Sequence, residues 1–248
     1  MKILLSLSVI FVVGGTLGWL LEFFYRRYAH GKWINPGFLC GPCLPLYGSG
    51  LILLYGLCLI DYSFIASKPL QIVVRILVQT VILTAIEYVT GLIFTKAFHV
   101  SLWDYSSRWG NIGGIICPLF SVIWGAVGAL YSFLLHPWLE KLVPIITGSA
   151  SYTYFLGIYM GVWLVDICYS FHVVAKIKAW AAEQQLTVRY ENLKVAIVKR
   201  AEEMKKKRHF LFSFRSDSNI REELENYRNS LKLKNLKQRL GKRREKQK

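Results

Sequence analysis

The sequence predicts an all-α membrane protein, a polytopic helical bundle of about five transmembrane helices followed by a basic cytoplasmic helical tail. Of the 248 residues, 54% are hydrophobic, and within residues 1–175 they form long apolar runs separated by short polar loops. A helix needs roughly 20 mostly apolar residues to cross the hydrocarbon core of a bilayer, and these runs approach that length. Charged residues are frequent from residue 176 onward, so we expect residues 176–248 to form a separate, solvated tail.

Five segments have the composition of membrane spans. They lie at residues 3–25, 45–60, 70–96, 112–135 and 151–174. The second is the shortest, and Pro45 and Asp61 bound it. The first continues as an apolar run to Phe24 without a small-x-small cleavage site, so we interpret it as a retained span and not as a signal peptide.

The positive charge is distributed unequally along the chain. Residues 1–175 hold 9 Lys or Arg against 6 Asp or Glu, a net charge of +3, whereas residues 176–248 hold 22 against 9, a net charge of +13. Because cytoplasmic loops carry the excess of Lys and Arg, the tail and the loops 26–44 and 97–111 are expected in the cytoplasm and the amino terminus outside. The expected location is the bacterial inner or cytoplasmic membrane, crossed several times. A basic tail beside a span favours anionic lipid as its partner over nucleic acid.

Three carboxylates interrupt the predicted spans. A carboxylate at such a position costs a few kcal/mol, so Glu22, Glu87 and Asp166 should face the bundle interior or a cavity. All three fall in the cytoplasmic half of their spans, where they can share one polar pocket. Glu22 also has a simpler interpretation, an ion pair with Arg26 one helical turn later. Glu87 has no basic residue within a turn, and we expect it to be functional; the alternative is a structural role in which it binds backbone groups freed by Pro42 or Pro45.

The segment 35–48 combines proline, glycine and aromatic residues. Pro36, Pro42 and Pro45 prevent a regular helix, because proline lacks an N–H donor and disfavours helical geometry in the preceding residue. Irregular backbone at membrane depth must be covered by protein or line a water-filled cavity. The segment therefore predicts either a tight interfacial turn or a re-entrant segment that lines a substrate or ion pathway.

A second segment repeats several of these features. It begins at Trp103-Asp104, contains an Asn-x-Gly motif at Asn111, and leads into the next span through Pro118. Each segment follows a span that carries a carboxylate. The pattern suggests a duplicated two-helix unit. The candidate substrate or ion pathway consists of Glu22, Glu87, Asp166, Asn35, Gly37, Pro42, Pro45, Tyr47, Trp103, Asp104 and Asn111.

The sequence predicts no cofactor or metal site and assigns no catalytic residue. Cys40 and Cys43 have the spacing of metal ligands or of a redox pair, but the chain lacks a second such pair, so small apolar fillers are favoured. The chain also lacks the phosphate-binding motif G-x-x-x-x-G-K-[ST]. In the tail, apolar stripes that include Tyr190 and Leu224 predict helices at 176–208 and 220–241. These helices can dock a partner or rest on the lipid surface, and the sequence leaves both open.

Several of these motifs resemble a bacterial family of ABC-transporter permeases of type IV. The resemblance covers about residues 14 to 130 and leaves the fifth span and the tail outside it. Family members usually carry Arg where this chain has Pro36. The motifs are Gly18-Trp19 with Glu22, Asn35-Pro36-Gly37-Phe38-Leu39 with Gly41-Pro42, Pro45-Leu46-Tyr47-Gly48, Glu87-Tyr88, Trp103-Asp104-Tyr105-Ser106 and Asn111-Ile112.

The resemblance implies a multi-span membrane protein that acts as a transporter or as the permease subunit of an ABC transporter, and it specifies no substrate. The ATPase would then be a separate chain, and a second copy of this chain is the other protein partner considered. One alternative is a membrane enzyme that acts on lipid-linked substrates at the cytoplasmic leaflet, with Glu22, Glu87 and Asp104 as acid and base groups. Another is a membrane scaffold or regulator whose tail recruits a partner.

Overall fold

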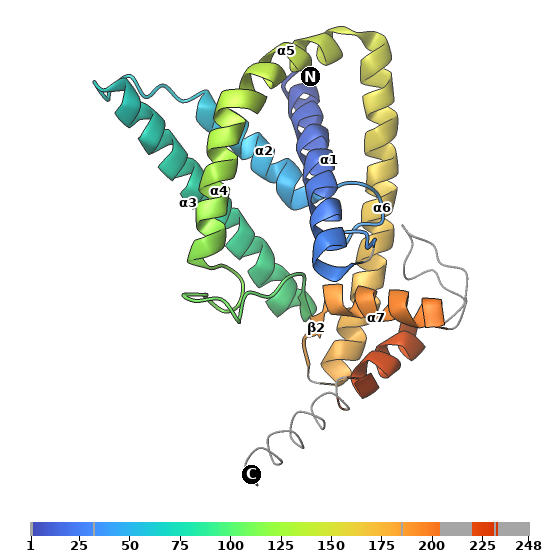
Figure 1. The fold of residues 1–248 in the computed structure, drawn as a ribbon. Coiled ribbons are helices and arrows are strands. Elements are labelled where there is room, and N and C mark those ends of the chain that lie inside the picture. The colour runs from blue at the N-terminus through green and yellow to red at the C-terminus, as the bar shows by residue number, and fades with distance from the viewer. Residues whose placement is uncertain (1, 32, 185, 204–219, 231, 233–248) are drawn as a thin grey trace.

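The computed structural model describes residues 2–31, 33–184, 186–203, 220–230 and 232 (Figure 1). Helices dominate, and the only named strands in the described residues are two short ones, β1 and β2. In chain order the elements are α1 (Lys2–His30), α2 (Pro45–Cys58), α3 (Lys68–Phe98), β1 (Val100–Ser101), α4 (Pro118–Leu130), the π-helix η1 (Tyr131–Leu135), α5 (His136–Gly148), α6 (Ala150–Glu183), β2 (Val188–Arg189) and α7 (Tyr190–Glu203).

The predicted all-α polytopic membrane fold is confirmed. Within the described residues, four helices are long and apolar enough to cross a membrane: Lys2–Ala29, Lys68–Phe98, Pro118–Gly148 and Ala150–Glu183. The third of these runs from α4 through η1 into α5, so it begins and ends later than the expected span 112–135. Figure 1 shows α5 and the amino terminus at one end of the bundle and α7 at the other, and we call these the α5 end and the α7 end.

The helix in the structure at the expected span 45–60 is shorter than predicted. Helix α2 has 14 residues and is therefore about 21 Å long, less than the roughly 30 Å of a hydrocarbon core. Residues 33–44 form the irregular connection that precedes α2. The N–H of Leu44 donates to the carbonyl of Gly15 over 3.0 Å, near the middle of α1. From His30 back to Gly15 is about 22 Å along a helix, so this segment turns back from the end of α1 and is re-entrant.

Small residues of α1 allow the close approach of α2. A Cβ atom built on Gly14 would lie 2.6 Å from Cβ of Leu51, and one on Gly18 would lie 2.3 Å from Cγ of Tyr47. Both distances are shorter than any van der Waals contact. Glycines at such positions let the two helix backbones pack closely, which is a common way to associate helices where the surrounding lipid provides no hydrophobic driving force.

The first part of the predicted tail packs on the bundle. Helix α6 continues without a break to Glu183, and α7 follows after a turn, so two helices share the expected range 176–208. β1 and β2 pair in parallel with Val100 opposite Val188. The buried cluster at the α7 end joins Val174, Ile177, Leu193, Leu224 and Tyr227. The second expected helix is present over 220–230, whereas 204–219, 231 and 233–248 lie outside the described residues.

A polar group is buried nearer the α5 end. Gln79 is fully buried on α3, and its amide donates to the hydroxyl of Ser132 over 3.0 Å and to the sulfur of Cys58 over 3.4 Å. Ser132 lies in η1, where the i→i+5 pattern widens the turn. Neither Gln79 nor η1 was anticipated from the sequence.

Replacing Gly18 with alanine should weaken the packing of α1 on α2. The added methyl group would overlap the ring of Tyr47, and overpacking of this kind destabilises proteins by about 1–3 kcal/mol. The matched control is Gly157→Ala on α6, where a Cβ meets nothing within 4 Å. Thermal unfolding in mild detergent should show a lower melting temperature for Gly18→Ala only. Equal melting of the two variants would show that α1 and α2 do not require this close contact.

Candidate functional site

Asp166 of α6 holds the re-entrant segment. Its two carboxylate oxygens accept backbone hydrogen bonds from Cys40 over 2.9 Å and from Gly41 over 2.7 Å. The hydroxyl of Ser170, one turn later on α6, donates to the same carboxylate over 3.0 Å. Three donors thus offset the cost of placing this carboxylate in a span. Asp166 was predicted to face the bundle interior or a cavity, and the structure places its carboxylate against backbone N–H groups of the re-entrant segment.

Asn35 organises the first half of the same segment. Its side chain is buried, accepts a hydrogen bond from the indole of Trp19 over 2.7 Å, and donates to the carbonyls of Leu39 and Cys40 over 3.1 and 2.8 Å. Gly37 follows with a positive φ of 69°, a conformation that glycine adopts without strain. Further along, Pro42 is exposed and Pro45 begins α2.

Lys194 of α7 reaches the re-entrant segment from the α7 end. Only 3% of this residue is exposed, and its ammonium donates to the carbonyls of Asn35 over 3.1 Å and of Gly37 over 2.8 Å. Among the described residues it forms no ion pair with a carboxylate. Burial, followed by the positive charge of Arg26, lowers the pKa of Lys194 to about 7.

A chain of charged groups runs beside Lys194. Arg26 on α1 pairs with Glu22 one turn earlier over 3.1 Å and with Glu191 of α7 over 2.6 Å. The other oxygen of the Glu22 carboxylate accepts a hydrogen bond from the hydroxyl of Tyr47 over 3.3 Å. The predicted pair of Glu22 with Arg26 is therefore present, and it extends to the tail.

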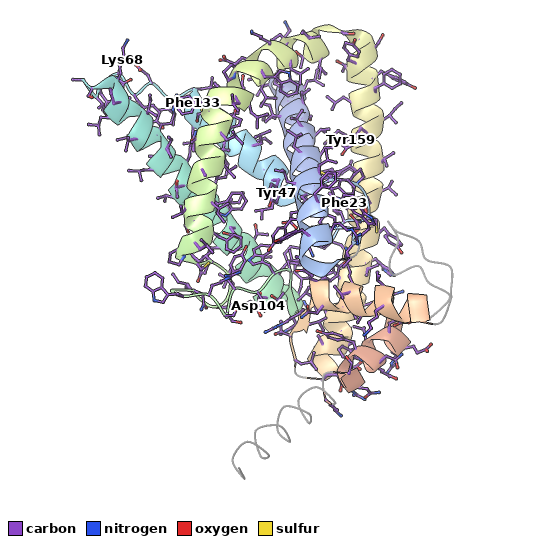
Figure 2. All side chains as sticks on the ribbon, viewed as in Figure 1. Phe23, Tyr47, Lys68, Asp104, Phe133 and Tyr159 are labelled. Carbon is purple, nitrogen blue, oxygen red and sulfur yellow. The ribbon has the colours of Figure 1, made fainter. Side chains whose placement is uncertain are left out.

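Glu87 of α3 has neutral partners. It is 3% exposed and accepts hydrogen bonds from the indole of Trp124 over 2.8 Å and from the hydroxyl of Tyr105 over 3.1 Å. The rings of Trp124 and Tyr47 lie 5.6 Å apart, which connects Glu87 to Glu22 through two aromatic side chains. Figure 2 shows Tyr47 in the interior of the bundle beside α1.

The second proline-glycine segment is braced by its own side chains. The indole of Trp103 donates to the carbonyl of Ile115 over 2.8 Å, and the amide of Asn111 donates to the carbonyl of Arg108 over 2.8 Å. Asp104 pairs with Arg189 of β2 over 2.6 Å, and Figure 2 shows Asp104 at the α7 end. This segment is therefore tied to the tail and does not bring Asp104 to Glu22 or Glu87 by any hydrogen bond within the described residues.

A cavity of about 390 Å³ lies between α1, the re-entrant segment, the start of α2, α3, α6 and α7. Aromatic and aliphatic side chains form most of its wall. Four charged residues also line it: Glu22, Arg26, Glu191 and Lys194. Among the predicted residues, Gly37, Pro45, Tyr47 and Trp103 line the cavity together with Glu22, whereas Glu87 and Asp166 do not. The three carboxylates therefore do not share one cavity wall.

Sequence reasoning missed Glu191 and Lys194, because in a charge-rich tail they cannot be distinguished from charged residues that face solvent. A signal for Lys194 was nevertheless present. It lies within the apolar stripe of Tyr190, Leu193 and Ile197, which recurs at helical spacing, and all three of these residues are buried. A lysine inside the buried face of a helix needs a partner across the interface, which here is the backbone of the re-entrant segment.

Lys194 should make the stability of the protein depend on pH. Between pH 7 and the usual pKa of 10.5, the unfolded chain holds a proton on this lysine that the folded protein lacks, so stability should rise with pH across that interval. The charged and titratable groups around it are Arg26, which lowers its pKa, and Cys40, Glu191 and Asp166, which raise it.

The measurement compares melting temperatures of the wild type and of Lys194→Met in uncharged detergent at pH 6, 7.5 and 9. Relative to this variant, the wild type should be least stable at pH 6 and should improve toward pH 9. A difference that does not change with pH would show that Lys194 keeps an ordinary pKa in the folded protein.

Comparison with known proteins identifies the chain. No curated protein and no solved structure matches it. One protein family does, over residues 9–171, which is more than half of the chain. The match extends beyond the expected 14 to 130 and includes most of the membrane part of α6, with Asp166, while leaving α7 and Lys194 outside. The chain therefore belongs to the family whose description is "Putative ABC-transporter type IV".

Proposed function

We propose that this protein is the membrane-embedded permease component of an ABC-type transporter in the bacterial cytoplasmic membrane, with its carboxyl terminus in the cytoplasm. The observation that carries the proposal is the cavity beside the re-entrant segment and the half-length helix α2. Transporters build substrate sites near the middle of the membrane from interrupted helices and irregular backbone. The family membership supports the same function.

The hydrogen bonds that the carboxylates of Glu22 and Glu87 already accept favour transport over acid and base catalysis. Glu22 accepts hydrogen bonds from Arg26 and Tyr47, and Glu87 accepts them from Trp124 and Tyr105. A general acid or base needs an oxygen available to the reacting group. Groups that are already engaged in this way serve better to hold helices in place around a pathway, and we assign that role to Glu22, which lines the cavity, and to Glu87, which ties α3 to α4 without lining it.

The energy for transport must come from a second chain, because this sequence has no phosphate-binding loop. We place the ATPase at the α7 end. There the segment between β1 and α4 is joined to the tail by the Asp104–Arg189 pair and by β1 and β2. The tail is joined in turn to the re-entrant segment through Lys194. A movement of the ATPase can therefore be transmitted to the cavity through direct contacts of the tail and the re-entrant segment.

Site-directed cross-linking tests this proposal in the native host. A photoreactive residue at position 109, where Trp109 is 87% exposed at the α7 end, should cross-link an ATPase chain that carries a phosphate-binding loop. The matched control is the exposed position 63 in the connection between α2 and α3, which should give no such product. Absence of an ATPase among the products from position 109, or an ATPase product from position 63, would overturn the proposal.

The orientation has its own test. Residues Arg26, Arg27, Lys96 and Arg108 and the tail place most of the positive charge at the α7 end, which supports a cytoplasmic location for it. In intact cells, a membrane-impermeant thiol reagent should therefore label Ser63→Cys and spare Trp109→Cys until the cells are permeabilised. Unmodified protein with its five cysteines is the background control. Labelling in the reverse order would invert the topology.

A further inference from the structure

We propose that the cavity binds an anionic amphiphile with a single aliphatic chain, and that Lys194 binds its head group. The proposal names the substrate class of the transport site and rests on the proposed function for its biological role. The ligands of this class share an anionic head group, a carboxylate or a phosphate, on one aliphatic chain. Three observations carry it: a buried ammonium that forms no ion pair within the described residues, N–H groups without an acceptor at the start of α2, and the size and lining of the cavity.

The first observation is the environment of Lys194. An ammonium removed from water is costly unless it is paired, and in the described part of the chain Lys194 has two carbonyl partners and the face of the Tyr190 ring, whose centroid lies 5.0 Å from its Nζ, but no ion pair. The nearby carboxylates are already engaged, because Glu22 and Glu191 both pair with Arg26. An ammonium has three donors and the two carbonyls accept from two of them, so the third has no acceptor oxygen among the described residues and can bind a ligand in the cavity that Lys194 lines.

The second observation is the start of α2, which also lines the cavity. No side chain caps this helix, and within the described residues no acceptor binds the N–H groups of Leu46 and Tyr47. The first turn of a helix carries a partial positive charge and is a common site for anions. The carbonyls of Asn35 and Gly37 are taken by Lys194. The two carboxylates that line the cavity, Glu22 and Glu191, both pair with Arg26, whereas Lys194 and the start of α2 offer donors to a ligand, and an acceptor-rich anionic group complements them.

The third observation is the remaining wall. Phe11 and Trp163 meet edge to face, with ring centroids 4.9 Å apart, and Phe94 and Phe171 stack with centroids 6.5 Å apart. All four residues line the cavity, where they contribute apolar surface. A volume of about 390 Å³ lies at the small end of the roughly 300–1,000 Å³ of ligand sites, which suits one aliphatic chain better than two.

Binding can be measured on the full-length protein in uncharged detergent with brominated dodecanoate, because bromine quenches indole fluorescence and two tryptophans, Trp103 and Trp163, line the cavity. We expect saturable quenching that both dodecanoate and dodecyl phosphate reverse. Dodecanol should compete at least tenfold more weakly, and inorganic phosphate should not compete. Equal competition by dodecanol would overturn the anionic head group. Competition by inorganic phosphate would overturn the need for a chain.

Variants assign the head group to Lys194. Lys194→Met should weaken binding at least tenfold, whereas the control Lys176→Gln, which changes an exposed lysine of α6, should leave it unchanged. If Lys194→Met lowers the melting temperature, Thr90→Phe provides a second test, because it fills part of the cavity and leaves Lys194 in place. Thr90→Phe should also weaken binding. Wild-type affinity in either correctly folded variant would contradict the proposal.

These results separate the two proposals. An ATPase cross-link without binding of any alkyl carboxylate or phosphate overturns the substrate class and leaves the transporter function standing. Binding that requires Lys194 in the absence of an ATPase partner overturns the transporter function and leaves the amphiphile site standing.

Discussion

The need to satisfy every backbone polar group within the membrane governs this structure. Hydrocarbon supplies no hydrogen bonds, so the irregular segment 33–44 is stable at its depth because side chains bind its N–H and C=O groups. Asp166 binds two N–H groups, Asn35 binds two carbonyls, and Lys194 binds two more. These three side chains fix where α2 begins, and the start of α2 in turn shapes the cavity.

The two helix pairs solve similar problems with different chemistry. In α1 and α2 the carboxylate of Glu22 receives a charged donor from Arg26 and a neutral one from Tyr47. In α3 and α4 the carboxylate of Glu87 receives two neutral donors, Trp124 and Tyr105. Both following helices begin at a proline. The correspondence agrees with the suggested duplication, although the second connection stays at the α7 end while the first turns back along α1.

Sequence reasoning could predict the features that depend on local composition. Apolar length identified the helices, and the prolines at 36, 42 and 45 marked a segment that could not be helical. The pair of Glu22 with Arg26 followed from helical spacing. Partners that are distant in the sequence could not be predicted. Asp166 with Cys40, Lys194 with Gly37 and Asp104 with Arg189 depend on how the helices pack, and no local pattern encodes that packing. The roles of these residues in transport stay predictions.

The Asp166 contact also sets an order of events during synthesis. Cys40 and Asp166 are 126 positions apart, and chains grow at about 5–20 residues per second, so the re-entrant segment waits roughly 6–25 s for the side chain that holds it. During that time α2 is too short to be stable in lipid alone, since a 14-residue helix is below the length of an independent span. Until α6 has been synthesised, the first two helices must be held together by their glycine contacts or must remain bound to the insertion machinery.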